Sequence, residues 1–298
     1  MFKNITLYRI SNLPDHFGVG AAELCPFAFE PCGPTQEKSV GWIPPRGHEN
    51  GALIESVAGQ IILKLMIESK TVPADVIRRE VAERTSHIES STGRKPGKKE
   101  TREISEDVRQ FLLPMAFTKQ AATLVWIDKE SKLMVIDSAS QSRLDDVLTA
   151  LVKSIDGLEL QMVNTIISPA SAMAQWLIEQ EGPSGFTVDR ECELKACDES
   201  KAVVKYGRHP LDIEEVAQHI TKGKIPTRLA MTWNDRISFV LTDGFQLKKI
   251  SFLESVFKTI NVGMTLENDA FDADIAILTG ELKSMIPDLI EALAGEPS

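Results

Sequence analysis

The sequence predicts an α+β fold in which antiparallel sheets and hairpins are interleaved with helices. Three observations support this class. Residues 124–137 contain two apolar runs on either side of a short polar turn, which is typical of a β-hairpin. Residues 225–252 contain three strand-like runs separated by polar turns, which indicates a three-stranded meander. Segments with apolar residues at helical spacing separate these strands along the chain.

The first part of the chain is expected to form strands and short loops. Residues 5–10 alternate in the manner of a strand, and residues 59–67 form an apolar run of the length typical of a buried strand. Between them, Pro and Gly interrupt the pattern, so residues 27–33, 42–45 and 52–57 are interpreted as short strands or loops.

Two helices are predicted to follow. The first begins at Pro73, because proline is favoured in the first turn of a helix, and its apolar residues are Val76, Ile77, Val81 and Ile88. The second covers about residues 99–113 and ends at Pro114. We expect its apolar face to point inward, with Ile104, Val108, Phe111 and Leu112. We expect its basic face to meet water, with Lys98, Lys99, Arg102 and Arg109.

The remaining elements follow from the same signals. After the hairpin we expect a helix over 141–155, a strand over 158–163, a helix over 168–180, and strands over 186–194 and 202–206. Asp212 is expected to cap a helix that ends at Lys222. The last long helix covers about residues 275–294, although residues 273–278 also fit a strand that leads into it.

The chain of 298 residues is 43% hydrophobic, which is enough to bury a sizeable core. We interpret it as one unit with a basic arm at about 70–120, a hairpin and helix core at about 121–180, a second basic sheet region at about 201–252, and the C-terminal helix. No apolar stretch is long enough to cross a membrane, and no secretory signal is evident, so a cytoplasmic location is expected.

The cysteines do not indicate a metal site. The spacing of Cys25, Cys32, Cys192 and Cys197 matches neither a paired CxxC site nor a compact disulfide framework. We expect these cysteines to be buried free thiols.

Positive charge is concentrated in two windows of an acidic chain. The net charge is -10, yet residues 64–119 carry 12 Lys and Arg against 9 Asp and Glu, and residues 201–249 carry 9 against 5. Such polarised charge favours a surface for an anionic partner. Ordinary solvated faces would give the same composition, and charge alone favours that interpretation.

Lys and Arg that contact phosphates give affinity for DNA without reading its sequence. The candidates in the first window are Arg94, Lys95, Lys98, Lys99, Arg102 and Lys119. The candidates in the second window are Lys205, Arg208, Lys222, Lys224, Arg228, Lys248 and Lys249. Few aromatic residues accompany them, so duplex DNA is favoured over a single strand.

No pattern indicates a catalytic or cofactor site. The run at residues 93–99 lacks the spacing of a phosphate-binding loop, and the five histidines have no metal-ligand spacing. Asp128 and Asp137 lie on opposite arms of the predicted hairpin, where a pair of carboxylates could hold the metal of a nuclease. Structural or turn-capping roles are favoured for both residues.

Several short motifs, in this order, resemble the bacterial recombination-associated protein RdgC family over essentially the full length. They are Phe2-Lys3-Asn4 with Tyr8-Arg9, Pro31-Cys32-Gly33, Gly41-Trp42-Ile43-Pro44-Pro45, Gly59-Gln60-Ile61, Leu112-Leu113-Pro114-Met115-Ala116-Phe117, Trp126-Ile127-Asp128, Phe271-Asp272-Ala273-Asp274 and Leu278-Thr279-Gly280-Glu281-Leu282.

The resemblance implies a nucleoid-associated homodimer that closes into a ring around double-stranded DNA and restrains recombinase filaments. It also implies no enzymatic activity, and we expect no cofactor. Phe117 matches the phenylalanine of the family that projects towards the ring interior, and Lys119 keeps a basic residue just after it. Met115 stands where a basic residue is expected, and Pro96-Gly97 interrupts what is elsewhere a continuous basic helix.

Three functions therefore remain open. The favoured one is a sequence-independent ring on duplex DNA. The second is a metal-dependent nuclease that uses Asp128 and Asp137. The third is a module that binds a recombinase directly, without DNA. For Phe117, composition favours burial, whereas the resemblance implies exposure, and exposure is the expectation adopted here.

Overall fold

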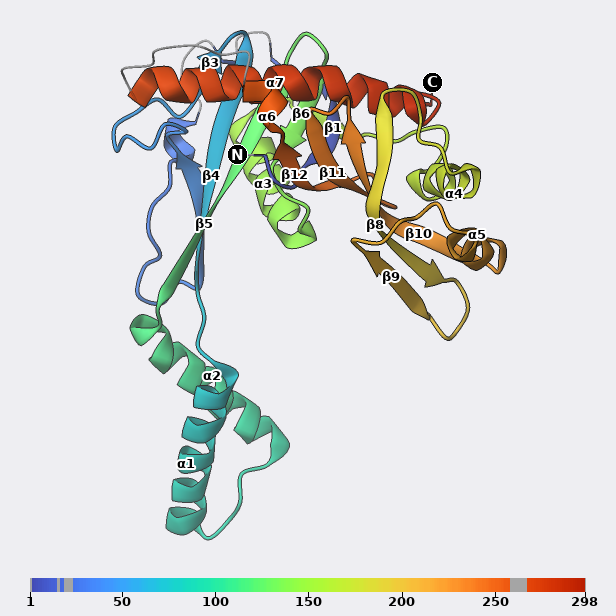
Figure 1. Ribbon diagram of the computed structural model, residues 1–298. Coiled ribbons are helices and arrows are strands. Elements are labelled where there is room, and N and C mark those ends of the chain that lie inside the picture. The colour runs from blue at the N-terminus through green and yellow to red at the C-terminus, as the bar shows by residue number, and fades with distance from the viewer. Residues whose placement is uncertain (1, 15–16, 19–23, 258–266, 298) are drawn as a thin grey trace.

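The computed structural model describes residues 2–14, 17–18, 24–257 and 267–297, and it confirms the α+β class (Figure 1). Two antiparallel sheets form the body, and a pair of helices projects from one of them as an arm (Figure 1). The arm leaves the larger sheet at the end of its two longest strands.

The first sheet has seven strands in the order β2-β4-β5-β6-β1-β7, with β3 also paired to β4. Its strands are β1 (Thr6–Asn12), β2 (Lys38–Ile43), β3 (Glu55–Val57), β4 (Gln60–Lys70), β5 (Thr118–Asp128), β6 (Leu133–Ile136) and β7 (Glu159–Met162). The predicted hairpin is β5 and β6, and the predicted buried strand is β4. The β4 and β5 strands pair from Ile61 opposite Ile127 to Lys70 opposite Thr118, so both strands reach the root of the arm.

The second sheet has five strands in the order β12-β11-β10-β8-β9. Its strands are β8 (Phe186–Ala196), β9 (Val203–Gly207), β10 (Lys224–Trp233), β11 (Ile237–Thr242) and β12 (Leu247–Phe252). The predicted meander is confirmed as β10 to β12. In β8 the residues alternate between buried and more exposed positions, which gives this sheet one face towards the core and one towards water.

The two sheets are joined through the start of the chain and through helix α7 (Glu267–Ala292). Ile5 and Leu247 exchange backbone hydrogen bonds of 2.8 and 3.1 Å. The α7 helix lies across both sheets (Figure 1), and it buries Leu282 in a core that also contains Trp126 and Phe239. Since α7 begins at Glu267, the alternative of a strand over residues 273–278 is wrong.

The arm consists of α1 (Ala74–Thr92) and α2 (Lys98–Leu112), followed by the short 3-10 helix η2 (Leu113–Met115). The helices were predicted correctly, but the inward face of α2 was not. Only Val108 is buried in α2, whereas Ile104 and Leu112 are half-buried and Phe111 is 60% exposed. The physical reason is that the hairpin projects beyond the sheets (Figure 1), so the two helices pack mainly against each other.

Shorter helices complete the fold. They are η1 (Cys25–Phe27), α3 (Gln141–Ser154), α4 (Pro169–Glu179), α5 (Glu214–Thr221) and α6 (Glu254–Phe257). The α3 helix packs Leu144 and Leu151 onto a second core, beneath the seven-stranded sheet. The N-cap of α5 is Ile213 and makes no side-chain hydrogen bond, so the prediction that Asp212 caps this helix is wrong. The chain takes one more extended residue before its first helical turn.

The prediction that all four cysteines are buried is wrong. Cys192 is buried in β8, and burial raises its pKa to about 12. Cys32 is half-buried. Cys25 is exposed at the start of the short helix η1, and Cys197 is exposed just beyond the end of β8. Over the described ranges, no helix combines the length and the apolar character needed to cross a membrane.

Candidate nucleic-acid interface

One side of the arm presents unpaired positive charge. Lys98 and Arg102 are four residues apart on α2 and so lie on the same face of the helix. Together with Lys95 of the preceding loop they border a groove of about 700 Å³ between the two helices, which also contains Ile77 and Val81 of α1. None of the ion pairs among the described residues includes these three cations. We call this set of five residues the basic face.

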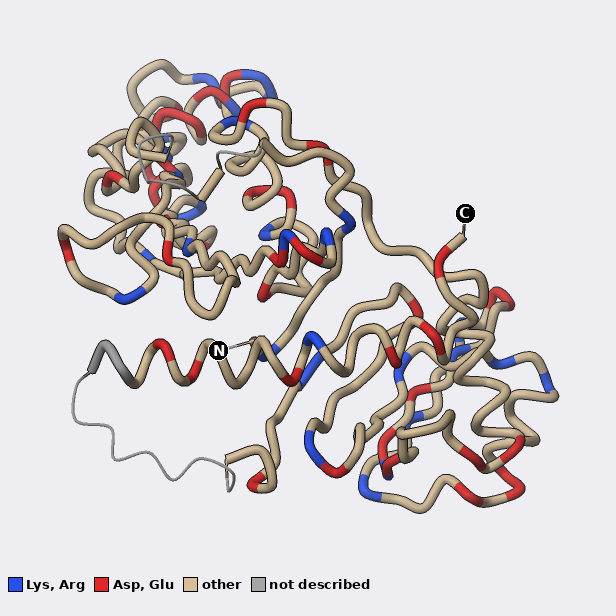
Figure 2. The backbone as a smooth tube through the Cα atoms, turned by 90° about the horizontal axis from the view of Figure 1, so that it is seen from above, with Lys and Arg blue, Asp and Glu red and all other residues tan. Residues whose placement is uncertain are grey.

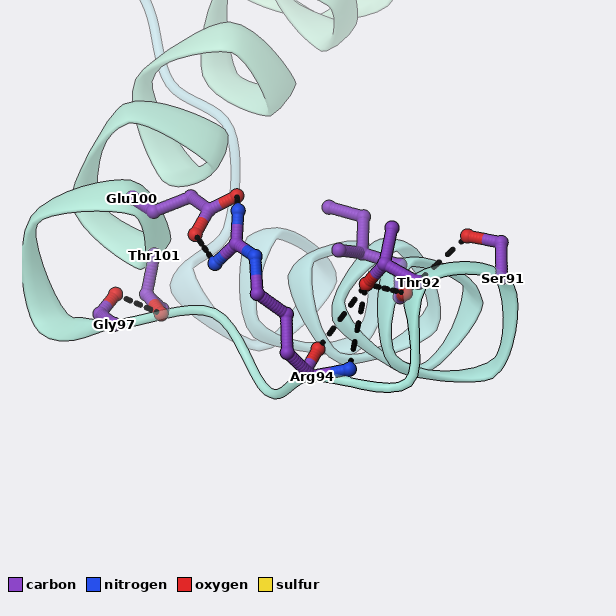
Figure 3. Close-up of polar contacts among 7 residues, drawn as sticks. Ser91, Thr92, Arg94, Gly97, Glu100 and Thr101 are labelled. Atoms are coloured by element: carbon purple, nitrogen blue, oxygen red, sulfur yellow. Dashed lines mark hydrogen bonds and ion pairs between the residues drawn. The ribbon is translucent and has the colours of Figure 1, made fainter.

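Arg94 is held within the arm instead. Its guanidinium donates to both carboxylate oxygens of Glu100 at 2.7 and 3.1 Å (Figure 3), and this pairing raises the pKa of Arg94 and lowers that of Glu100. In the same turn Thr101 donates its hydroxyl to the Gly97 carbonyl at 3.0 Å. Figure 3 shows Arg94 closing the loop between α1 and α2, so it is less available to a ligand than its neighbours.

Lys99 and the Pro96-Gly97 interruption also lie in or next to the loop between the helices. Lys99 lies 4.0 Å from Glu103 on the same helix. Gly97 is the N-cap of α2, and Pro96 is buried just before it, so the Pro96-Gly97 interruption lies in the turn between the helices. The basic helix therefore starts only at Lys98.

A second exposed group lies where the arm meets the sheet. Phe117 is 94% exposed and Met115 is 64% exposed, and Lys119 follows at the start of β5, also exposed. Exposure of Phe117 is thus confirmed. An aromatic ring held in water beside a cation is a suitable contact for a partner, because its burial on binding would be favourable.

The substitution Phe117→Ala is expected to leave the thermal stability of the protein nearly unchanged, within about 0.5 kcal/mol, because no core contact is lost. The matched variant Phe239→Ala removes a side chain that is 2% exposed and is expected to cost about 3 to 5 kcal/mol. Thermal melts of both variants would test this. A large loss of stability in Phe117→Ala would show that the ring is packed in solution.

In the second window, glutamates of β8 neutralise several candidates. Glu193 lies 3.0 Å from Lys205 and 3.9 Å from Arg228, and Lys249 lies 2.5 Å from Glu191. Burial opposes the ionisation of Glu193, but the hydrogen bond from Lys205 and the nearby Arg228 outweigh it and lower its pKa. Over the molecule as a whole, Figure 2 shows basic and acidic segments interspersed. This region is therefore a surface of mixed charge.

The other candidates of this window vary in their surroundings. Lys224 lies 3.1 Å from Nδ1 of His219. Arg208 and Lys222 are exposed and Lys248 is half-buried, and none of the three belongs to an ion pair within the described part of the chain. Sequence reasoning missed Glu191 and Glu193. Their spacing of two residues in a strand could have indicated that they share the outward face of β8.

Asp128 and Asp137 do not form a shared site. The Asp137 amide donates to the Leu124 carbonyl at 2.9 Å, so Asp137 lies across from a residue four positions before Asp128. This places the two residues roughly 13 Å apart along the strand. A metal ion bound by both carboxylates is therefore excluded by the register of the hairpin, which the sequence did not reveal.

Each carboxylate instead has a structural role, as favoured from the sequence. Asp137 accepts the backbone amides of Phe2, Lys3 and Asn4 at 2.8 to 3.1 Å. Asp128 accepts the amide of Glu130 at 3.0 Å and lies 3.2 Å from the ammonium group of Lys283 on α7. Burial opposes the ionisation of Asp128, but hydrogen bonds from Ser131 and Lys283 outweigh it and lower its pKa.

Comparisons with known proteins agree on one family. A family model described as "RdgC: Putative exonuclease, RdgC" matches residues 1–296. A protein of Herminiimonas arsenicoxydans named "Recombination-associated protein RdgC" is 42% identical over 99% of this chain and 98% of its own length. Proteins of the same name from Janthinobacterium sp. (strain Marseille) and Bordetella pertussis are 44% and 39% identical, with the same coverage.

Proposed function

The chain belongs to the RdgC family, and from this premise we propose that it binds double-stranded DNA without sequence preference, as a homodimeric ring that restrains recombinase filaments. In this proposal the protein is associated with the nucleoid and performs no catalysis. Its contacts are with phosphates, which are the same along any duplex.

The observation that carries the proposal is the basic face of the arm. Lys95, Lys98 and Arg102 are exposed and have no carboxylate partner among the described residues, although the chain as a whole is acidic. Unpaired cations bind phosphate without first giving up an internal ion pair. Lys119, Arg208 and Lys222 are the next candidates on the same ground, followed by Lys248, which is half-buried and also has no carboxylate partner among the described residues. Lys205, Arg228 and Lys249 would have to exchange a glutamate for a phosphate.

The dimer is supported by the incompletely buried apolar surface of the arm, where Ile88 and Ile104 are half-buried and Phe111 is exposed. Ile88 and Ile104 border a second groove with Glu83, Arg84 and Asp107, and the Arg84 guanidinium lies 5.3 Å from the centre of the Phe111 ring. We call these six residues the mixed face. A helical pair with so little buried surface is marginal alone, and balanced charges suit contact with a second copy of the chain.

A twofold dimer presents every basic surface twice, so two arms and two sheets could surround a duplex about 20 Å wide. The nuclease alternative is less favoured, because the two residues proposed for it, Asp128 and Asp137, lie far apart and accept hydrogen bonds from backbone amides. The recombinase-binding alternative remains distinguishable, since that complex would form equally well in the absence of DNA.

The proposed ring can be tested with closed circular and linear DNA of the same sequence. We expect a dimer by sedimentation at micromolar concentration, with affinity that falls steeply as salt rises. We also expect complexes on closed circles to persist after a salt jump that frees linear DNA, because only open ends let a ring slide off. A monomeric protein, or equal release from both forms, would contradict the ring.

A further inference from the structure

The loop of residues 32–37 crosses the root of the arm and is attached firmly at one end. The backbone amide of Cys32 donates to Oε1 of Glu68 at 2.7 Å, and the side-chain amide of Gln120 donates to Oε2 at 2.6 Å. Glu68 of β4 is 3% exposed and lies opposite Gln120 of β5. The hydrogen bonds from Gln120 and Cys32 lower the pKa of Glu68, so it is ionised at neutral pH. This end of the loop is fixed to both strands that lead into the arm.

The other end of the loop reaches the arm itself. The Lys70 amide donates to the Glu37 carbonyl at 2.8 Å, at the last residue of β4. The Glu37 carboxylate accepts from Nε and Nη2 of Arg109 on α2 at 2.8 and 3.2 Å. Both side chains of this ion pair are 49% exposed. The ion pair is therefore bidentate but accessible to water, and such exposed pairs break and re-form readily.

We propose that the loop of residues 32–37 positions the arm, with Glu68 as its anchor and the pair of Glu37 with Arg109 as a releasable contact that sets the arm's angle. The covalent connections to the arm are the short segments 71–73 and 113–117, and the helices stand clear of both sheets (Figure 1). A brace from the body to α2 therefore restrains rotation about these connections.

The effect of the arm's angle on DNA binding rests on the proposed function. The angle of the arm decides whether Lys95, Lys98 and Arg102 face a duplex that lies against the sheets. Glu37, Glu68 and Arg109 are positioning residues in this scheme, because they act through the placement of the basic face. Release of Arg109 from Glu37 would also let the arm move aside.

The distance between arm and body tests the brace directly. Spin labels are attached at Ser91→Cys, near the end of α1, and at Ser251→Cys in β12, both exposed. The background carries Cys25→Ser, Cys32→Ser and Cys197→Ser. Labelled protein is mixed with a tenfold excess of unlabelled protein, so that distances within one chain dominate, and is measured by pulsed dipolar spectroscopy.

We expect one narrow distance in the parent and a broad distribution in Glu37→Arg or Arg109→Glu. Because the double variant restores the ion pair with its charges exchanged, it is expected to restore the narrow distance. Glu68→Ala is expected to broaden the distribution in a way that this exchange does not repair. The matched control Glu103→Arg removes an exposed glutamate of α2 that lies 4.0 Å from Lys99 on the same helix, and should leave the distance unchanged.

Narrow distances in both single variants, or no recovery in the double variant, would overturn the proposal. The outcome does not depend on DNA, so it is distinguishable from failure of the proposed function, which would appear as no duplex binding by the unaltered protein. Where both hold, the single variants should bind duplex about tenfold more weakly and the double variant should recover. A loss that persists after the exchange would assign Arg109 to phosphate contact instead.

Discussion

Replacement of Lys95, Lys98 and Arg102 with alanine is expected to weaken binding to every duplex alike. It should also reduce the slope of log affinity against log salt by about 3, since each lost phosphate contact removes about one unit. We expect this effect because these three cations form no ion pair with any residue that the structure describes. Titrations of two unrelated duplexes at several salt concentrations would measure both quantities.

The matched control is the triple variant with Lys205, Arg228 and Lys249 replaced by alanine. It removes the same formal charge, but these residues are already paired in the free protein, Lys249 with Glu191 and both Lys205 and Arg228 with Glu193. We therefore expect a slope change below about 1. Equal slopes in both triple variants would mean that net charge alone drives binding. A loss that depends on the DNA sequence would contradict nonspecific recognition.

The strands and most helices could be predicted because their signals are local. The alternation in β8 and the apolar run of β4 each reflect a face that the strand itself buries. The end of α2 before Pro114 likewise depends on one residue and its neighbours. Such features need no knowledge of what lies across the sheet.

The prediction of a buried face on α2 was wrong because helical periodicity identifies an apolar face but not the surface against which it packs. Phe111 and Ile104 have the spacing of core residues, and in a compact domain they would be buried. Here the helices project from the body, so the same pattern leaves Ile104 half-buried and Phe111 exposed. An apolar stripe in sequence is compatible with an internal core or with a second chain.

Residue type alone suggested the candidate cations, but it could not show which of them are paired with carboxylates. The neutralisation of Lys249 by Glu191 joins residues 58 positions apart, and the contact of Arg109 with Glu37 spans 72. Both depend on strand order and on the direction of the arm, which no local pattern specifies. Exposure of Phe117 was anticipated only through the resemblance, since composition favoured burial.

Substitutions in the mixed face of the arm are expected to dissociate the proposed dimer. The double variant Ile88→Asp and Ile104→Asp places two carboxylates at the proposed contact between arms, and a twofold dimer doubles them to four. Burial of an unpaired carboxylate is strongly unfavourable. We expect the dimer to dissociate at least 100-fold more readily, so that monomers dominate at micromolar concentration by sedimentation.

A matched control separates interface loss from a general effect of added charge. Val152→Asp changes an apolar side chain of α3 that is 58% exposed and remote from the arm, and it should remain a dimer. Circular dichroism of the double variant should keep the helical signal of the body, because α3, α4 and α7 do not depend on the arm.

If the double variant stays dimeric, the two copies meet through another surface and the mixed face is solvated. If it becomes monomeric and also loses its retention on closed circles while the basic face is intact, then retention requires two arms that meet, as expected for a ring and not for independent binding of each copy.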